Sequence, residues 1–550
     1  MKGYLNKEPL SQERFYPIIL VLLCLTLYIP NLGGRDLWCG RETLYAEIAR
    51  ETLLNGHWFV PYFNGEMYYN KPPLYFWLIA LTSIPVGDVT EFTLRLPSAL
   101  SALGTVLVAY FLGKRLYSAR AGFLAGIILA TSPGFHKYAC IAKLETPLAL
   151  FITSSIAAFY LGLTTSSNKR WYLLWGWFLM GLAMLTKGLG VVLIVPVIFL
   201  YLLSRRELHR MWETEPLLGG VVLLATIMIW LLPGYIIGGP DYIQGLVGHF
   251  SHHVGQSPKY IKPFYYITEA FVGTLPWSLI LPALFFYLRR DIDDKYREGL
   301  RLSAIWFIAM WIVFSAIMAK RSRYILPIYP AIALAAAALW DHYIAKTSET
   351  WSKIKVIPVL TLSLSAGIVV VLTTSHAIVL TPIVGNLIAL CMIALLMTWW
   401  FSVQAGQYKV LFISFFVMIT SFDMAYTQIS LPKESQAGAE KAVCEKALAN
   451  MEPGAPWALY RFFSPDYVFY GRTHLKTIGS EKDLADFLSS KERVYCIVRE
   501  GDYAKIDLST LNVSAFKITE LEKTGKRAAK FVLISNKPDE IQKIPPGSEI

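Results

Sequence analysis

The chain has 550 residues, of which 55% are hydrophobic and only 16% charged, and its mean hydropathy is +0.45. Soluble domains carry about a quarter charged residues, so this composition excludes an ordinary soluble protein. The net charge of +12 does not call for a nucleic-acid partner, because the surplus of Lys and Arg lies in loops between apolar segments, where the positive-inside rule explains most of it.

The first apolar segment, residues 16–31, follows three basic residues and no small-x-small cleavage site follows it. We therefore expect a retained membrane helix with a cytoplasmic N-terminus rather than a signal peptide. Further apolar runs of about 17–25 residues predict a polytopic, mostly α-helical membrane protein. The pattern predicts about thirteen spans, at 16–31, 96–113, 120–136, 146–163, 172–186, 188–204, 216–236, 267–288, 302–319, 324–344, 356–376, 379–401 and 409–428.

Residues 32–95 form a long first loop that is rich in acids, bases and aromatic residues. Its segment 72–86 is apolar but short for a span, and counting it as one would place the later basic clusters outside, against the positive-inside bias. We predict that this segment is an interfacial or re-entrant helix and that the whole loop, with its juxtamembrane helices, lies on the outer face. Because each span carries the chain to the other side of the membrane, the same count of spans places four other segments on the outer face: 137–145, Lys187, 237–266 and 320–323.

From about residue 431 the chain becomes more polar, and helix-like stretches alternate with the strand-like segments WALYRFF, RVYCIVRE and AAKFVLIS. The sequence predicts a membrane domain over 1–430 and an exported α/β domain over 431–550. An oxidising compartment permits a disulfide between Cys444 and Cys496, and the sequence leaves open whether they pair.

The segment RETLYAEIARE predicts an amphipathic helix on the membrane that begins at Glu42 and turns Leu44, Ile48 and Tyr45 toward lipid. A carboxylate at a helix start is also an ordinary cap. A second carboxylate, Glu145, stands at the outer end of an apolar helix as a base or metal ligand, although charges at span ends are common.

Several basic residues gather on the predicted outer face, where the positive-inside rule does not explain them. Lys71 precedes a proline-opened helix turn, where an ammonium group favours a bound anion such as phosphate, with snorkelling to headgroups as the alternative. Lys187 lies between two apolar runs. The full set of five cations is Lys71, Lys187, Lys320, Arg321 and Arg323. The histidines of the outer segment HFSHH favour hydrogen bonding or substrate contact over a metal site.

Collinear motifs along most of the membrane part resemble those of integral-membrane glycosyltransferases of the protein-mannosyltransferase type, and most closely the lipid A aminoarabinose transferase (ArnT-like) family. They are LWCGRETLYAEIARE, FNGEMYYNKPP, LETPLALF, LTKGLG, HF followed by PFYY and LPW, and KRSRYILPIYP. The resemblance implies a GT-C fold, a polyprenyl (undecaprenyl) phosphate sugar as donor, and an active site on the periplasmic side of the bacterial inner membrane. The implied acceptor is lipid A or another envelope glycan or protein.

The resemblance also implies roles for individual residues. The catalytic residues would be Glu42 and Glu145, which are also the candidate ligands if a divalent metal ion takes part; no cofactor is otherwise expected. Phosphate groups would be bound by Arg41, Lys71, Lys187, Lys320, Arg321 and Arg323, and substrate would be contacted by Tyr45, His249, His252 and Tyr324. Arg41 departs from the family, which carries aspartate there, so either Glu42 replaces that aspartate or Arg41 serves another acceptor or a phosphate.

The expected reaction is attack of an acceptor oxygen on the anomeric carbon with inversion, while basic residues stabilise the departing polyprenyl phosphate. A hydroxyl acceptor needs a base, whereas an anionic phosphate acceptor does not. The alternatives are a protein or cell-wall-glycan mannosyltransferase-like enzyme and, less favoured, a lipid or solute transporter. A transporter predicts internal repeats and ionisable residues at mid-membrane depth, and neither is evident in the sequence.

Overall fold

The computed structural model describes residues 13–37, 41–254, 264–284, 292–316, 320–345, 397–398, 401–402, 405, 407–438, 440–506, 515–523 and 529–538. The chain forms two compact units. The first comprises Met1–Pro30, Tyr69–Tyr75 and Leu96–Thr427, and the second comprises Asn31–Tyr68, Phe76–Arg95 and Gln428–Ile550. Most of the first loop therefore belongs to the same unit as the C-terminal part of the chain.

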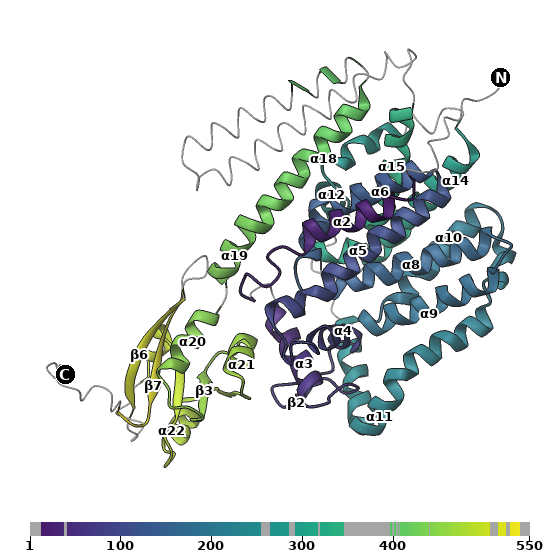
Figure 1. Cartoon of the computed structure of the whole chain (residues 1–550). Coiled ribbons are helices and arrows are strands. Elements are labelled where there is room, and N and C mark those ends of the chain that lie inside the picture. Colours follow the sequence, from purple (N-terminus) through teal and green to yellow (C-terminus); the bar gives the residue numbers. More distant parts are fainter. Residues whose placement is uncertain are drawn as a thin grey trace, which may run out of the picture. The chain divides into compact units, whose positions relative to one another are not determined.

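The first unit is a bundle of helices, in which α8, α9 and α10 run side by side and α6, α14 and α18 pack around α15 (Figure 1). Its helices are α2 (Tyr16–Tyr28), α5 (Glu91–Leu116, which belongs to this unit from Leu96 on), α6 (Ala119–Ala130), α7 (Pro133–Ala139), α8 (Glu145–Thr164), α9 (Lys169–Lys187), α10 (Gly190–Ser204), α11 (Pro216–Val254), α12 (Tyr265–Gly273), α14 (Asp294–Ala316), α15 (Tyr329–Ala345) and α18 (Tyr408–Ala425). Short 3₁₀ segments join them at η1 (Leu208–Thr214), η2 (Trp277–Ala283) and η3 (Ser322–Ile328).

Six helical segments in the described part are long and apolar enough to cross a membrane. They are Glu91–Leu116, Glu145–Thr164, Pro216–Gly248, Asp294–Ala316, Ser322–Ile344 and Tyr408–Ser435. The predicted spans 356–376 and 379–401 lie outside the described residues, apart from 397, 398 and 401. The structure thus agrees with a polytopic membrane protein, while the predicted count of about thirteen spans stays a prediction.

Two predicted spans are interrupted in the structure. The predicted span 120–136 is divided into α6 and α7, because Pro133 cannot continue a helix and instead begins the next one. The predicted span 267–288 is divided into α12 and the 3₁₀ segment η2, with Pro276 between them. By contrast, α11 turns at Gly239, whose φ of +65° suits glycine, close to the end predicted for that span at residue 236.

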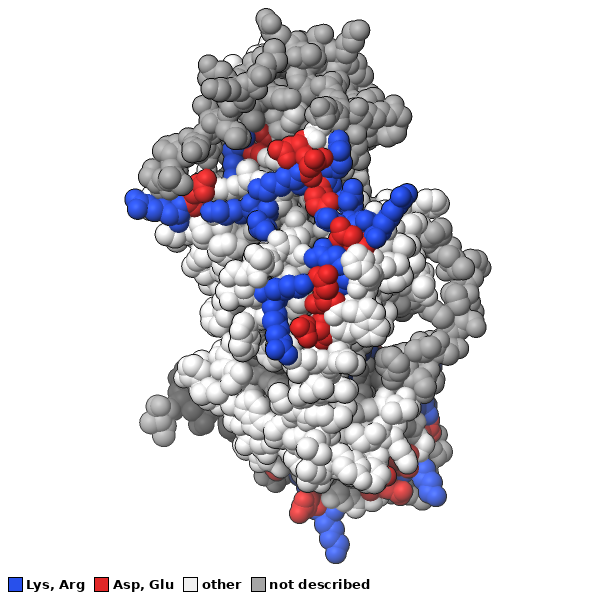
Figure 2. All heavy atoms as spheres, turned by 90° about the vertical axis from the view of Figure 1, so that its right-hand side faces the viewer, with Lys and Arg blue, Asp and Glu red and all other residues white. Residues whose placement is uncertain are grey.

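One face of the structure carries a broad area in which no Lys, Arg, Asp or Glu is visible, between two zones of charged side chains (Figure 2). It is seen from the side on which α9, α10 and α11 lie in Figure 1. On α11, large apolar side chains such as Leu217, Val221, Leu232 and Ile236 are more than half exposed. An uncharged area of this kind is expected where a helix bundle faces lipid.

The first loop contributes four elements to the structure: α3 (Glu42–Leu54), β1 (Tyr62–Phe63), β2 (Glu66–Met67) and α4 (Leu74–Ser83). At about 1.5 Å per residue, the ten residues of α4 reach only about 15 Å, half the thickness of a bilayer core. α4 is therefore a short helix and not a span, in agreement with the prediction for 72–86.

The predicted helix at 42–51 forms as α3, but its lipid-facing side was predicted wrongly. Leu44, Tyr45 and Ile48 are all buried, and α3 packs against α21 (Pro465–Gly471) from the C-terminal part of the second unit. An apolar stripe on a helix shows that one face is covered, and here protein rather than lipid covers it.

The C-terminal part contains a five-stranded sheet in the order β4-β3-β5-β7-β6. Its strands are β3 (Trp457–Tyr460), β4 (Lys476–Ile478), β5 (Tyr495–Arg499), β6 (Phe516–Lys523) and β7 (Ala529–Ser535). β3, β4 and β5 are parallel, whereas β7 runs antiparallel to β5 and β6. The remaining helices there are α19 (Leu431–Gly438), α20 (Lys441–Ala449), α22 (Glu481–Leu488) and α23 (Glu500–Tyr503).

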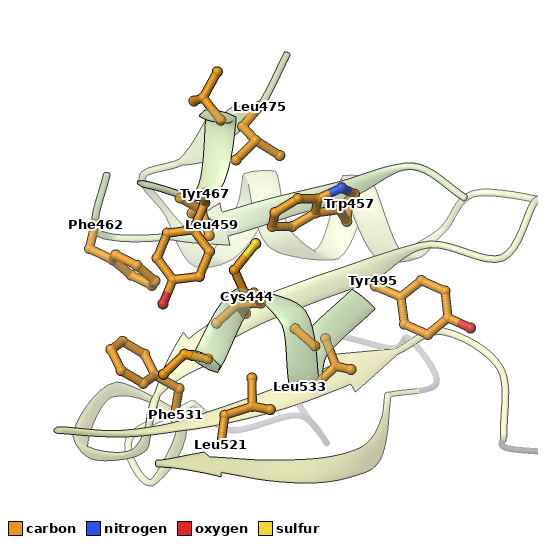
Figure 3. Packing of buried hydrophobic residues seen from close by; sticks show 14 residues of the cluster. Cys444, Trp457, Leu459, Phe462, Tyr467, Leu475, Tyr495, Leu521, Phe531 and Leu533 are labelled. Atoms are coloured by element: carbon orange, nitrogen blue, oxygen red, sulfur yellow. The ribbon is translucent and has the colours of Figure 1, made fainter. Parts of the chain in front are cut away.

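The sheet has a hydrophobic cluster on each face, and the two cysteines lie in different clusters. Cys444 of α20 packs among Trp457, Leu459 and Leu533 on one face (Figure 3). Cys496 belongs to the cluster on the other face, because successive residues of β5 point to opposite sides of the sheet. Both are buried free thiols, so they do not form the disulfide that the sequence left open.

Candidate active site

Three charged side chains from distant parts of the first unit meet at Glu145. Glu145 begins α8, Lys187 ends α9, and Arg323 lies in η3. Lys187 Nζ and Arg323 Nε each donate to Oε1 of Glu145, both at 2.9 Å. The structure thus brings together three of the residues that the sequence predicted for the site.

This cluster is largely shielded from solvent, since the side chains of Glu145 and Lys187 are only 4% and 10% exposed. The ring of Tyr324 lies beneath Lys187, with Nζ 3.9 Å from the ring centroid, as in a cation–π contact. Lys143 is also buried, two residues before Glu145. Cations therefore outnumber the single carboxylate, so the cluster has a positive charge to offer to an anion.

Neighbouring segments hold the cluster in place through neutral hydrogen bonds. The hydroxyl of Ser98 on α5 donates to the carbonyl of Lys143 and accepts from its amide, both at 3.2 Å. Tyr75 lies 3.0 Å from the same hydroxyl. On the other side, the hydroxyls of Tyr138 in α7 and Ser322 in η3 are 2.9 Å apart. These contacts tie the segment before α8 to α5 and the segment before Arg323 to α7.

The other predicted cations have the following surroundings. Lys320 donates to the carbonyls of Phe314 and Ser315 at 3.2 and 2.6 Å, and so satisfies the end of α14. Burial lowers the pKa of Lys320. The side chain of Arg321 is exposed. Lys71 is half-buried, and α4 begins at Leu74, two residues after the start predicted at Pro72.

Glu42 lies in the second unit, in a setting that the sequence did not predict. Arg95 grips its carboxylate with two hydrogen bonds, from Nε at 3.0 Å and Nη2 at 2.9 Å. Arg35 Nη1 lies 3.8 Å from the same carboxylate. None of the Glu42 or Arg95 side-chain surface is exposed. A carboxylate closed off in this way and held by arginine is poorly suited to accept a proton from a substrate.

The remaining predicted site residues have different surroundings. Arg41 is exposed, and its guanidinium lies near Tyr68; burial raises the pKa of Tyr68 to about 12 and Arg41 opposes that rise. Tyr45 is buried against Phe76, with ring centroids 5.8 Å apart. His249 and His252 lie in α11, but their side chains fall outside the described part of the chain.

The two glutamates do not fit a divalent metal in this arrangement. Glu42 is bound by arginine and Glu145 by lysine and arginine, and these cations occupy the carboxylates that a metal would need. No group of three or more His, Cys, Asp or Glu that could hold a metal ion occurs among the residues that the structure describes.

Family models match two stretches of the chain. The model of dolichyl-phosphate-mannose-protein mannosyltransferases matches residues 70–232, and that of the Alg9-like mannosyltransferase family matches residues 246–394. An uncharacterized protein of Aquifex aeolicus is 30% identical over 350 residues, which are 63% of this chain and 68% of that protein. The undecaprenyl phosphate-alpha-4-amino-4-deoxy-L-arabinose arabinosyl transferase of Shewanella sediminis is 30% identical over 326 residues, 58% of each chain.

Among solved structures, ArnT from Cupriavidus metallidurans bound to undecaprenyl phosphate aligns with a TM-score of 0.76. The alignment covers 95% of this chain and 98% of ArnT at 20% identity, and so shows a common fold. The chain thus shares the fold of an ArnT and is similar in sequence to aminoarabinose transferases over somewhat more than half of its length. The family models and the named relatives are glycosyltransferases and not transporters, and six described helices are long and apolar enough to cross a membrane. The matched region spans less than three fifths of the aminoarabinose transferase from Shewanella sediminis.

Sequence reasoning missed several buried polar residues that have specific partners in the structure. Arg95 and Ser98 stand at the start of an apolar run, where the single charge in LRLPSAL was the available signal. Asp423 was overlooked although it is the one charged residue in an apolar stretch of more than fifteen residues. Such isolated charges in a membrane segment are retained for a reason, and each marks a contact that the sequence alone does not identify.

Proposed function

We propose that this chain transfers a sugar from undecaprenyl phosphate to a lipid A-type acceptor at the periplasmic face of the inner membrane, as an aminoarabinose-transferase-like enzyme. The observation that carries the proposal is the cluster of Lys187 and Arg323 on Glu145, which offers a surplus of positive charge at the end of membrane helices. Sequence similarity to undecaprenyl phosphate aminoarabinose transferases and the fold shared with an ArnT bound to undecaprenyl phosphate support the choice of donor.

In the proposed sugar transfer, the main task of the protein is to stabilise the negative charge of the leaving phosphate. When the acceptor oxygen attacks the anomeric carbon, the bond to the donor oxygen breaks and polyprenyl phosphate leaves as an anion. In this proposal Lys187 and Arg323 stabilise the negative charge as it develops, in a poorly solvated place where such contacts are strong. Attack from the side opposite the leaving group inverts the anomeric configuration.

The state of the two glutamates favours a phosphate acceptor over a hydroxyl. A hydroxyl needs a base, but Glu42 and Glu145 are each held by cations and are poor proton acceptors. A phosphate of lipid A is already anionic and needs no base. We propose that Glu145 holds Lys187 and Arg323 apart in the right places, and that the outer cations Lys71, Lys320 and Arg321 and the exposed Arg41 meet phosphates of donor or acceptor.

The proposal includes the topology that the sequence predicts. About thirteen spans place the first loop, the Glu145 cluster and an α/β domain over 431–550 on the periplasmic side, with 1–430 as the membrane domain. The side chains Tyr45, Tyr324, His249 and His252 are proposed to contact substrate. Reporter fusions at residues 165 and 431 would test this topology, with a cytoplasmic signal expected at the first and a periplasmic signal at the second.

Substitution of Lys187 tests the charge cluster. We expect Lys187→Ala to lower transfer from undecaprenyl-phosphate sugar by about 100-fold or more, because one of the two groups that stabilise the leaving phosphate is lost. Glu145→Gln should retain more activity than Lys187→Ala, since no proton transfer is assigned to it. Transfer is measured with purified protein in detergent, without a sealed compartment, by mass spectrometry of the product lipid.

Lys169→Ala is the matched control, because Lys169 begins the same helix and pairs with Glu213 at 2.6 Å far from the cluster. Its transfer rate should stay within about twofold of wild type. Wild-type activity of Lys187→Ala would contradict the proposal, as would complete loss of activity in Glu145→Gln with an intact fold.

The acceptor is tested separately by a deletion strain. Loss of a sugar from lipid A that returns with the wild-type gene but not with Lys187→Ala supports a lipid A acceptor. Loss of sugar from a secreted protein or from another envelope glycan, with lipid A unchanged, supports instead the mannosyltransferase-like alternative that the family models keep open.

A further inference from the structure

A second cluster of buried ionisable groups lies in the first unit, outside the cluster at Glu145. His136 of α7 and Asp423 of α18 are 1% exposed each. Nδ1 of His136 lies 3.1 Å from Oδ1 of Asp423. Nothing in the proposed chemistry uses either residue, and a buried ionic pair is expensive enough that its retention needs a physical reason.

The oxygens around the imidazole favour one additional proton on the pair. Nε2 of His136 lies 3.2 Å from the carbonyl oxygen of Leu27, so each ring nitrogen faces an acceptor. A neutral imidazole has only one N–H, and beside a carboxylate it would turn a lone pair toward one of these oxygens. One proton more, on the ring or on the carboxyl group, removes this repulsion and leaves the pair without net charge.

Further contacts fix the imidazole between three helices. Thr427 Oγ1 lies 3.2 Å from Nε2, and the ring of Tyr28 in α2 stacks on the imidazole at 5.8 Å. Tyr28 in turn donates to the carbonyl of Ala130 at 3.0 Å. Close packing adds to this, because a Cβ at Gly134 of α7 would collide with the hydroxyl of Tyr329. The short helix α7 thus has little freedom to move.

α7 is also connected to the cluster at Glu145. The carbonyl of Tyr138 accepts from Thr146 Oγ1 at 3.0 Å, in the first turn of α8. The hydroxyl of Tyr138 lies 2.9 Å from that of Ser322, the residue before Arg323. One turn of helix therefore joins His136 to both partners of the ion pair between Glu145 and Arg323.

We propose that His136 and Asp423 are a positioning pair for the active site: with one shared proton they fix α7 against α2 and α18, and through Tyr138 they set the places of Glu145 and Arg323. The proposal rests on the function proposed above for that cluster. It assigns the pair no contact with substrate and no part in proton transfer during the reaction.

Two substitutions of Asp423 separate positioning from charge. In Asp423→Asn the amide donates to Nδ1 of neutral His136, whose Nε2–H still meets the Leu27 carbonyl, so the geometry is kept without the extra proton. Asp423→Leu has a similar volume and no polar contact. We expect the transfer rate of Asp423→Asn to stay within about threefold of wild type. The transfer rate of Asp423→Leu should fall about tenfold or more, because small displacements of catalytic groups reduce rates strongly. The pH profile of the Asn variant should match that of wild type.

A readout independent of activity comes from Cys140, a buried thiol directly after α7. If the pair fixes α7, Asp423→Leu should raise the rate at which Cys140 is labelled by N-ethylmaleimide about tenfold, measured by mass spectrometry of its peptide. Thr427→Val removes only the hydroxyl beside Nε2 of His136 and should raise the Cys140 labelling rate by a smaller factor. This variant keeps the test valid if Asp423→Leu does not fold. Ser414→Ala, which removes only a bond within α18, is the matched control and should change neither readout.

The proposal is overturned if Cys140 is labelled at the wild-type rate in both Asp423→Leu and Thr427→Val, or if Asp423→Asn loses as much activity as Asp423→Leu. If wild-type protein transfers no sugar but its Cys140 labelling changes as described, the proposed function fails while the fixing of α7 by the pair stands.

Discussion

At the scale of single residues, Arg95 is the side chain on which the first loop depends most. It is fully buried, binds both carboxylate oxygens of Glu42, and donates to the carbonyls of Leu32, Arg35 and Asp36 at 2.6 to 3.0 Å. Every donor direction of the guanidinium is thus used to hold one turn of chain against the start of α3. Removing it leaves a buried carboxylate and three carbonyls without their donor.

We expect Arg95→Met to lower the free energy of unfolding by about 3 to 5 kcal/mol, as for other broken buried ion pairs. The double variant Arg95→Met with Glu42→Leu should recover part of that loss, because no charge is then left alone in the interior. Thermal unfolding in detergent measures both. A double variant less stable than the single one would contradict this account.

The transfer activity of Glu42→Gln tests whether Glu42 is structural or catalytic. Because Glu42 serves to hold Arg95, and glutamine keeps one acceptor for it, transfer should stay within about tenfold of wild type. A loss of several orders of magnitude with an unchanged melting temperature would instead identify Glu42 as the base that the sequence suggested.

Sequence reasoning reached the residue types of the site but not their partners. The motif LETPLALF identifies Glu145 and LTKGLG identifies Lys187. Nothing in either motif shows that Lys187 and Arg323 donate to the same carboxylate oxygen of Glu145. The same holds for Glu42, whose partner Arg95 lies 53 positions further along the chain. Pairing over such distances is set by how helices pack, and a single sequence does not contain that information in readable form.

At the scale of elements, α3 depends on α21 for its stability. Arg50 of α3 binds Glu47 at 2.8 Å, Asp88 at 3.1 Å and the carbonyl of Phe469 at 2.8 Å, and its guanidinium lies 4.0 Å from the centre of the Phe469 ring. Asn64 makes two hydrogen bonds to the backbone of Leu475. The loop and the C-terminal part are therefore joined by directional polar contacts as well as by apolar packing.

Arg50→Ala should loosen this junction. Cys444 provides the measurement, because burial raises the pKa of its thiol to about 12 and the thiol reacts only when the second unit opens. Arg50→Ala should increase Cys444 labelling at least tenfold, while Arg461→Gln, which alters an exposed pair with Glu481, should stay near wild type. Equal labelling in the two variants would show that the junction does not depend on Arg50.

The sequence predicted these elements better than it predicted their neighbours. α3 and α4 form where the pattern of 42–51 and 72–86 indicated, and β3, β5 and β7 lie in the three segments with strand character. The prediction that lipid covers the apolar face of α3 was wrong, because amphipathic periodicity is the same whether lipid or protein covers that face. The breaks at Pro133 and Pro276 were passed over because composition alone suggested continuous spans.

At the scale of the whole molecule, the second unit should be more stable in mild acid than at alkaline pH. Burial raises the pKa of Glu47 to about 7, with Arg50 opposing the rise, and burial raises that of Asp466 to about 6. For each acid the folded state binds more protons than the unfolded state between its ordinary and its raised pKa. The free energy of unfolding therefore falls as pH increases through about 4 to 7.

Glu47→Gln tests this directly, because glutamine stays neutral at every pH. The ratio of the Cys444 labelling rate in the variant to that in wild type should be near one at pH 5 and well below one at pH 8. At pH 8 only the wild-type protein is destabilised by a buried negative charge at position 47. The intrinsic reactivity of the thiol cancels in this ratio. A ratio that does not vary with pH would exclude Glu47 as the source of the dependence.

The grouping of Asn31–Tyr68 with Gln428–Ile550 has a consequence for biogenesis. A ribosome makes the early segment hundreds of residues before the part that covers it, so nascent α3 waits with its apolar side uncovered while the intervening helices enter the bilayer. Polypeptides that stop before α21 would keep that side bare and become targets for proteolytic quality control. In the topology proposed above, α3 would be covered only after α21 has crossed the membrane, so translocation of this part would limit the yield of folded protein.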